Sequence, residues 1–480
     1  MSQQTPSPAY VRTDMLPPAA PPRQQAGLLS WLRDNLFSGW LNTLLTVLSV
    51  VVIWSLIRHF WPWFAHSVWH ANSLAECRQI ITQTWGEGAT GACFAVIRVR
   101  WHQYIFGFYP RAEYWRPILT LGLLFIALTP VLFSVSATIR RWVLAGGGML
   151  CIVLLAVSAS PQWAAVLMLG LIAVALLLAE YAPRRLLVFT VLYPVLAVWL
   201  LWGGSPWYPF MLLAGIAVGY GVSALVPRGI SAATGIGVTI LWWAFLAHPA
   251  ADLATQILPL HLQVVQSSVF GGFLLSVVIG VSAIVLSLPL GILLALARQS
   301  KMFIIHSLAV VFIEFIRGVP LITLLFVALV LLKYFLPPQT NFDLILRVII
   351  MVTLFAAAYM AEVIRGGLAA LPKGQYEAAD SLGLNYWQAQ RLIILPQALK
   401  ISIPGIVGTF IGVFKDTTLV GLINLYDPLK GISDVVRSEF TWKGIYWEPF
   451  IFTGAIFFII CFSMSRYSMY LERRLSREHR

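Results

Sequence analysis

The chain has 480 residues, of which 59% are hydrophobic and only 11% are charged, and its mean hydropathy is +0.82. A soluble domain of ordinary composition carries about one quarter charged residues, so most of this chain is predicted to lie in lipid. The net charge of +13 does not indicate a nucleic-acid-binding protein, because the basic residues fall between apolar runs and do not gather in one solvated patch.

The first 28 residues differ from the rest of the chain. They contain six prolines and too few apolar residues to form a packed core. They also lack the compact apolar region of a cleaved signal peptide. Residues 1–28 are therefore predicted to form a disordered cytoplasmic tail.

Twelve apolar runs follow, each long enough to cross a bilayer as a helix, which takes about 17 to 25 residues. In chain order they cover residues 37–57, 116–137, 142–159, 163–182, 186–203, 208–226, 231–247, 269–297, 303–334, 343–363, 401–422 and 448–470. The predicted fold is an all-α integral membrane protein with twelve transmembrane helices.

Basic residues in the loops indicate the orientation, because short cytoplasmic loops carry an excess of Arg and Lys. If the N-terminus is cytoplasmic, this excess falls on the inner side at residues 140–141, 184–185, 228, 298–301, 365–400 and 473–480. The loop 58–115 also contains arginines, but long loops cross the membrane largely regardless of their charge. Both termini are therefore predicted to be cytoplasmic, and loop 58–115 to be external.

Four cysteines are present, and two of them share the external loop. Cys151 and Cys461 lie inside predicted spans, where they would pack as small apolar side chains. Cys77 and Cys93 would face an oxidising compartment, which favours a disulfide between them. Two unpaired thiols are the alternative.

The segment 372–396, between two predicted spans on the cytoplasmic side, is amphipathic and too polar to cross the membrane. Residues 375–382 are predicted to form a short helix that ends at Gly383, which supplies a left-handed conformation. Asn385 and Gln388 offer an N-cap and a partial capping box for a second short helix. Such a pair of helices suits a docking element for a partner protein, although a surface hairpin without a partner would explain the elbow equally well.

This segment resembles the coupling loop of binding-protein-dependent ABC importer permeases. The resemblance rests on seven positions with fixed spacing: Glu377, Ala378, Ala379, Gly383, Ile393, Leu395 and Pro396. The stretches EFIRGVPLITLLF at 314–326, AAYMAEVIRGGLAALPKGQ at 357–375 and FKDTTLV at 414–420 are similar to the branch that transports polar amino acids. The external loop, with GACFAVIRVRW and FGFYP, is similar to the longer permease subunit of general amino-acid uptake systems.

The resemblance implies a five-span type I importer core at residues 261–480, preceded by a transmembrane extension at residues 29–260. It implies a permease subunit in a bacterial inner membrane that imports polar L-amino acids and carries no catalytic site. Its partners would be a dimer of ABC ATPase subunits, a periplasmic amino-acid-binding protein and a second permease subunit, with a heterodimer favoured over a homodimer. The chain has no G-x-x-x-x-G-K-[ST] motif, so ATP and Mg²⁺ are expected on the ATPase subunits and no cofactor on this chain.

Charged residues inside predicted spans are functional candidates, because each costs several kcal/mol in lipid. One group is Glu314 and Arg317, which could pair one helical turn apart, just before the helix-interrupting Gly318 and Pro320. The second group is Lys415, Asp416 and Thr417. The two groups could bind the charged ends of an amino acid on its pathway, or could be ion pairs that fix helix packing or a gate.

A second charged pair and two alternative functions complete the predictions. Glu362 and Arg365, near the cytoplasmic face, are predicted to anchor the coupling helices. An ion-coupled secondary transporter would show two related halves, whereas the motifs here gather in the last five spans. A membrane-embedded enzyme would need a cluster of acidic or His residues, and His66 and His70 have no third ligand nearby, so no metal site is predicted.

Overall fold

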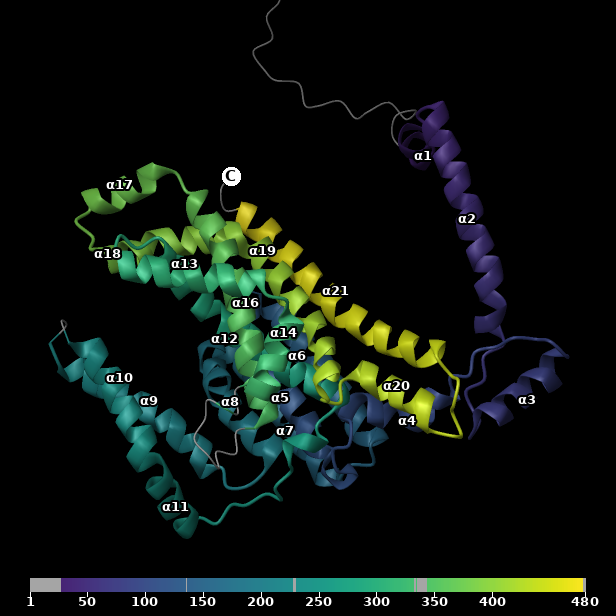
Figure 1. The fold of residues 1–480 in the computed structure, drawn as a ribbon, viewed down its shortest axis with the longest axis horizontal. Coiled ribbons are helices and arrows are strands. Elements are labelled where there is room, and N and C mark those ends of the chain that lie inside the picture. The colour runs from purple at the N-terminus through teal and green to yellow at the C-terminus, as the bar shows by residue number, and fades with distance from the viewer. Residues whose placement is uncertain (1–26, 135, 228–229, 332–333, 335–342, 478–480) are drawn as a thin grey trace, which may run out of the picture. The chain divides into compact units, whose positions relative to one another are not determined.

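The computed structural model describes residues 27–134, 136–227, 230–331, 334 and 343–477. These residues are largely helical and contain isolated β-bridges but no strand, which confirms the all-α prediction for the described part of the chain (Figure 1). They divide into two compact units: residues 27–71 with 75–94, and residues 72–74 with 95–477. Of the predicted disordered tail, residues 1–26 lie outside the described residues, while Leu28 already begins a helix.

The smaller unit contains α1 (Leu28–Leu36), α2 (Trp40–Ala65) and most of α3 (Leu74–Trp85). Helix α1 is amphipathic and was not predicted, because a nine-residue helix is shorter than a membrane-spanning run. Helix α2 is the predicted first span, and it continues eight residues beyond the predicted end at residue 57. The polar segment after it therefore begins at residue 66.

The larger unit begins with the helices of the extension. They are α4 (Ala95–Phe106), η1 (Arg111–Glu113), α5 (Trp115–Leu132), α6 (Ala137–Val157), α7 (Gln162–Tyr181), η2 (Pro183–Leu186), α8 (Leu187–Trp202), α9 (Trp207–Leu225), α10 (Ser231–Leu241), η3 (Trp242–Leu246) and α11 (Ala247–Ile257). The predicted span 231–247 is longer in the structure, because the π-helical turn η3 joins α10 and α11 into one continuous helix, Ser231–Ile257. Six of these helical segments are long and apolar enough to span a membrane, and α2 makes a seventh in the chain before residue 260.

The buried Arg140 shows how the extension satisfies the free carbonyl groups at its helix ends. Its guanidinium donates to the backbone oxygens of Phe133 and Ser134, which follow α5, and to that of Ala179 near the end of α7. A cation at the C-terminus of a helix both completes hydrogen bonds and opposes the helix dipole. Arg140 was predicted as a loop residue of the cytoplasmic side; it lies in the first turn of α6 and its side chain is buried, 5% exposed.

The C-terminal part of the larger unit contains the remaining helices. They are η4 (Ser267–Val269), α12 (Gly272–Arg298), α13 (Phe303–Gly318), α14 (Leu321–Phe326), η5 (Val327–Leu331), α16 (Leu344–Ala369), α17 (Lys373–Ser381), α18 (Tyr386–Ala389), η6 (Gln390–Ile394), α19 (Leu395–Asp416), η7 (Thr417–Ile423), α20 (Pro428–Ser438) and α21 (Trp447–Arg477). A continuous hydrophobic core joins these helices to the extension, with buried side chains drawn from Phe106 to Leu425. The boundary at residue 261 therefore stays a prediction based on family resemblance.

The predicted span 303–334 is broken at the position where Gly318 and Pro320 were expected to interrupt it. Helix α13 ends at Gly318, and α14 with η5 continues after a bend of 102°. The interruption follows from sequence, because Pro320 lacks the N–H of an uninterrupted helix and disfavours helical conformation in the residue before it. Counted as one broken span, this pair brings the described helices capable of crossing a membrane to twelve.

Helix α4 joins the extension to the core by close backbone contact. Gly107, which follows α4, and Gly272, which begins α12, both have left-handed φ angles, +65° and +59°. A Cβ atom at Gly107 would lie 2.4 Å from the Cα of Gly271, and one at Gly272 would lie 2.2 Å from the backbone oxygen of Tyr104. The two backbone segments can approach this closely only because Gly107 and Gly272 carry no side chain.

Candidate functional site: coupling segment and charge cluster

The coupling segment has the elbow that the sequence predicts. Helix α17 ends at Ser381, and Gly383 follows with a φ of +68°. The side chain of Asn385 then accepts a hydrogen bond from the N–H of Gln388 at 3.0 Å, while Gln388 Oε1 accepts one from the N–H of Asn385 at 3.1 Å. This reciprocal pair is a complete capping box, which starts α18 in a fixed direction.

The predicted second short helix is not an independent element. The chain is helical from Tyr386 through η6 and α19 to Ile423, so the segment after the elbow is the start of a membrane-spanning helix. The side-chain amide of Gln397 on α19 donates to Gln375 Oε1 on α17 at 2.9 Å. Helices α17 and α19 are therefore linked both through the elbow and by this hydrogen bond.

The seven motif residues divide between surface and packing positions. Glu377, Ala378 and Pro396 are exposed, Ala379 is buried, Gly383 forms the elbow, and Ile393 and Leu395 are half-buried. Leu382, Tyr386 and Trp387, which the sequence analysis did not single out, surround the elbow and are 71%, 52% and 66% exposed. A cluster of exposed apolar and aromatic side chains is typical of a protein interface. The adjacent Tyr386 and Trp387 in a polar segment are the sequence signal that could have indicated these interface residues.

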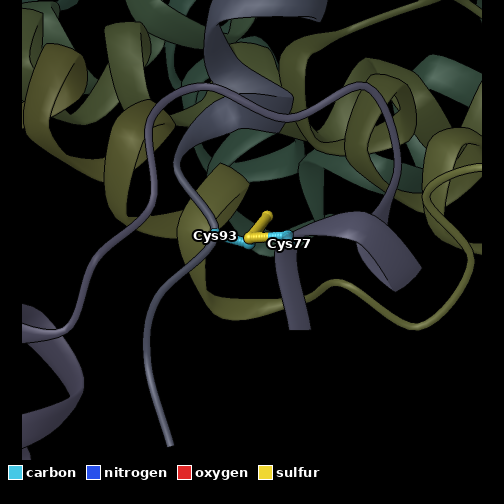
Figure 2. Close-up of a disulfide and its surroundings, with 2 residues drawn as sticks. All are labelled: Cys77 and Cys93. Carbon is cyan, nitrogen blue, oxygen red and sulfur yellow. A yellow bond between two sulfur atoms is a disulfide. The ribbon is translucent and has the colours of Figure 1, made fainter. Parts of the chain in front are cut away.

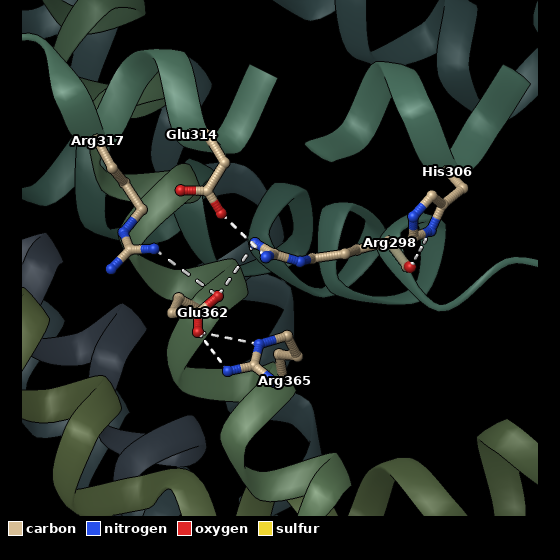
Figure 3. Close-up of polar contacts among 6 residues, drawn as sticks. All are labelled: Arg298, His306, Glu314, Arg317, Glu362 and Arg365. Carbon is tan, nitrogen blue, oxygen red and sulfur yellow. Dashed lines mark hydrogen bonds and ion pairs between the residues drawn. The ribbon is translucent and has the colours of Figure 1, made fainter. Parts of the chain in front are cut away.

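Five charged residues from three helices meet in the core, and Figure 3 shows their side chains pointing toward one another. Glu362 of α16 accepts hydrogen bonds from Arg365 on the same helix, at 2.9 and 2.5 Å, and from Arg298 at the end of α12, at 3.2 Å. Arg298 also lies 2.9 Å from Glu314 of α13, and Arg317 of α13 lies 3.8 Å from Glu362. We call these five residues the charge cluster.

The charge cluster shows which partners the charged residues take. Glu314 forms its ion pair with Arg298, not with Arg317, although the two residues of α13 are one turn apart. The ion pairs of Glu362 go to arginines of α12, α13 and α16 in the described residues, and the anchoring of the coupling helices by Glu362 and Arg365 stays a prediction. His306 Nδ1 makes a further contact at 2.6 Å with the backbone oxygen of Arg298. Gly318 and Pro320 lie at the bend that follows Arg317.

The second predicted group lies elsewhere. Lys415 is exposed and Asp416 half-buried at the end of α19, and the buried Thr417 donates from Oγ1 to the backbone oxygen of Phe414 at 2.7 Å. Ser402 of α19 hydrogen-bonds the backbone oxygen of Val363, beside Glu362, and Lys415 is 13 residues farther along the chain. At a rise of 1.5 Å per residue, Lys415 lies about 20 Å from the level of Glu362. The two predicted groups therefore lie at different levels along α19.

The external segment contains the disulfide shown in Figure 2. Cys77 of α3 is bonded to Cys93, with their Cα atoms 6.1 Å apart, and both side chains are buried. His66 stacks on the ring of Trp85 at 4.1 Å between centroids. No group of three or more metal-ligating side chains occurs within the described ranges.

The comparisons with known proteins give the family. Residues 287–477 match the family "Binding-protein-dependent transport system inner membrane component". The chain is 57% identical over 476 residues to the glutamate/glutamine/aspartate/asparagine transport system permease protein BztC of Rhodobacter capsulatus, covering 98% of this chain and 99% of that one. The chain belongs to this family of ABC transporter permeases. It is a membrane permease subunit of an amino-acid transporter, as predicted.

Other relatives agree with this assignment. The permease is 34% identical over 461 residues to the inner membrane amino-acid ABC transporter permease protein YhdY of Escherichia coli K12, covering 96% of each chain. The glutamate/aspartate import permease protein GltK of Escherichia coli O157:H7 is 31% identical over 209 residues, which are 42% of this chain and 91% of GltK. A solved structure titled as an amino acid ABC transporter with histidines is 30% identical, with a TM-score of 0.37, and covers 42% of this chain and 90% of that one.

Proposed function

We propose that the permease imports glutamate, glutamine, aspartate and asparagine, driven by ATP hydrolysis on separate subunits. The observation that carries the substrate class is the similarity to BztC over nearly the whole of both chains. The complex would comprise two ABC ATPase subunits that bind ATP and Mg²⁺, an extracytoplasmic amino-acid-binding protein and a second, different permease subunit. This chain itself would catalyse no covalent step.

The coupling segment would dock on an ATPase subunit. Its elbow offers a fixed shape outside the membrane, with Glu377 as a charge and Leu382 and Trp387 as apolar anchors. The hydrogen bond from Gln397 to Gln375 and the continuous helix from Tyr386 to Ile423 would carry the motion of the ATPase into the membrane. Alternating access of the substrate pathway would follow from this motion.

The orientation with both termini in the cytoplasm is supported by two observations. The disulfide after α2 suits an oxidising, extracytoplasmic compartment. Arg298, at the end of α12, contacts Glu362, seven residues before the end of α16, so α12 and α16 run in the same direction. The broken span between them must then cross the membrane once, so the coupling segment, which follows α16, would lie on the side of the membrane where α12 ends, as the cytoplasmic assignment of residues 298–301 requires.

Reconstitution in proteoliposomes tests this function. Uptake of radiolabelled glutamate and glutamine should require the binding protein outside and ATP with the ATPase subunits on the other side. An ion-coupled secondary transporter would instead accumulate substrate with an ion gradient and no ATP. Uptake under that second condition would contradict the proposal.

A further inference from the structure

Arg317 is the arginine of the charge cluster whose hydrogen-bonding capacity is least used. Glu362 Oε1 receives two hydrogen bonds from Arg365, and its Oε2 receives one from Arg298 at 3.2 Å. Arg317 reaches the same Oε2 only at 3.8 Å, which is beyond hydrogen-bonding distance. Its Nε atom is buried and has no hydrogen-bond partner. Figure 3 shows the guanidinium at the edge of the cluster.

The charge cluster is also one negative charge short. Arg298, Arg317 and Arg365 contribute three positive charges, and Glu314 and Glu362 contribute two negative charges. No other carboxylate forms an ion pair with these arginines among the described residues. A guanidinium that is two-thirds buried and lacks a close ionic partner is costly. The missing group is one carboxylate, and Arg317 is the position at which it is missing.

The surroundings of Arg317 suit a ligand that comes and goes. Its side chain is 32% exposed, at the point where α13 ends before the 102° bend. Lipid is a poor neighbour for an exposed guanidinium, so this face must meet a polar space or another subunit. The Cζ atom of Arg317 lies over the ring of Tyr359, 5.6 Å from the ring centroid, within the range of a cation–π contact. A guanidinium is itself planar and can bind a carboxylate with two parallel hydrogen bonds.

We propose that Arg317 binds the α-carboxylate of the transported amino acid, which replaces Glu362 as the partner of this arginine. The inference rests on the proposed function and names one contact of its substrate. The α-carboxylate is favoured over a side-chain carboxylate because the cluster is short of one negative charge, and because the α-carboxylate is the only carboxylate that glutamate and aspartate share with glutamine and asparagine. Binding would loosen the link between α13 and α16 that the Arg317–Glu362 contact provides.

A purely structural role for Arg317 makes different predictions. As a cation in the last turn of α13, it also stabilises that helix through the helix dipole. If this were its whole role, Arg317→Met would leave equilibrium binding of the substrate to the folded complex unchanged, and Glu362→Gln would not tighten it.

The experiment measures equilibrium binding of radiolabelled glutamate and glutamine to the purified complex without its binding protein and without nucleotide. Arg317→Met should weaken binding of both amino acids to the same degree, by about tenfold to hundredfold for a lost charge-assisted contact. Arg317→Lys should bind more weakly than wild type, because it lacks the planar fork. Glu362→Gln should bind more tightly than wild type, because the competing carboxylate is gone; a misfolded variant could not give that result. Arg437→Met, an exposed arginine on α20, is the matched control and should bind as wild type does.

Three results would overturn the inference. They are absence of binding to the wild-type complex, equal binding by wild type and Arg317→Met, and loss of glutamate binding alone with glutamine binding retained. Uptake by the wild type separates this inference from the proposed function. If wild-type proteoliposomes import none of the four amino acids, the proposed function fails; if they import them and Arg317→Met does so equally well, only the role of Arg317 fails.

Discussion

Asp427 is a buried carboxyl group outside the membrane-spanning helices, at the N-cap of α20. Burial raises its pKa to about 6, although the N–H groups of Leu429 and Lys430 donate to it. Because an unfolded aspartate has a pKa near 3.8, the contribution of this group to stability is complete below that pH and is lost as the pH rises through about 6.

The region around α20 should therefore be more stable at pH 5 than at pH 7.5, by on the order of 1 to 3 kcal/mol. Hydrogen exchange of residues 424–438 at the two pH values measures this difference. Asp427→Asn keeps an oxygen that can cap the helix but cannot titrate, so its exchange should depend less on pH. An equal pH dependence in both proteins would show that another group is responsible.

Substitution of Gly383 tests the conformation of the elbow separately from side-chain packing. A Cβ at this position would meet no atom within 4 Å, so a substitution acts through the backbone conformation alone. Gly383→Val should disturb the elbow, because a β-branched residue resists a positive φ. Gly383→Asn is the control, because asparagine tolerates the left-handed conformation.

The measurement is ATP hydrolysis by the reconstituted complex with and without the loaded binding protein. Gly383→Val should lose most of the stimulation while the chain remains in the membrane, and Gly383→Asn should keep it. Full stimulation in Gly383→Val would remove the elbow from the coupling of ATP hydrolysis to transport.

Helix α4 belongs to the extension in sequence, yet it packs on the core and forms a part of it. Arg100 forms an ion pair with Glu439, and the side-chain amide of Gln103 donates to the hydroxyl of Tyr426 at 2.5 Å. Gly107 completes the junction by backbone contact with Gly271. These contacts make α4 an integral part of the packing of the core.

A comparison of two glycines tests this junction. Gly107 and Gly88 both have left-handed φ angles, +65° and +86°, but only Gly107 has neighbours where a Cβ would be placed. Gly88→Ala should cost about 1 kcal/mol, the usual penalty for a left-handed alanine. Gly107→Ala should cost more, about 3 kcal/mol or above, because two backbones must also separate. Thermal unfolding of the two purified variants gives the difference, and equal losses would mean that the junction relaxes freely.

The bent span and the charge cluster show how far patterns within one helix can be used for prediction. Pro320 and Gly318 mark the interruption correctly, but their presence does not give the direction in which α14 continues. The i,i+3 spacing makes Glu314 and Arg317 possible partners, yet Arg298 of another helix takes Glu314. In both cases the outcome depends on neighbouring helices that are distant in sequence.

The twelve-span topology can be tested across the whole chain with single cysteines. In a variant with Cys151→Ala and Cys461→Ala, the remaining Cys77 and Cys93 are joined in the disulfide and do not react. Glu87→Cys, exposed in the segment after α3, should react with a membrane-impermeant maleimide added outside intact cells. Asp380→Cys, exposed on α17, should react only after the cells are lysed. Labelling of both in intact cells would mean that an even number of spans separates the two positions, against the nine spans of the twelve-span topology.

The helical fold, the number of spans and the elbow at Gly383 could be predicted from the sequence because each depends on local chemistry. An apolar run of sufficient length must form a helix in lipid, since no water is present to satisfy its backbone. Gly383 determines the turn, and Asn385 with Gln388 determines the cap of the next helix, all within six residues. The family motif lies in the same local segment, so it was recognisable without any knowledge of packing.

Three features could not be predicted in this way: the partners of the charged side chains, the angle of the 102° bend and the place of α4 in the core. Glu362 is 64 residues from Arg298, and Gln103 is 323 residues from Tyr426. The sequence offers each charged residue several possible partners. Which of them it contacts depends on which helices pack side by side. Packing in lipid depends on the complementary shapes of whole helix faces, and a pattern of residues along one helix does not specify the face of the next.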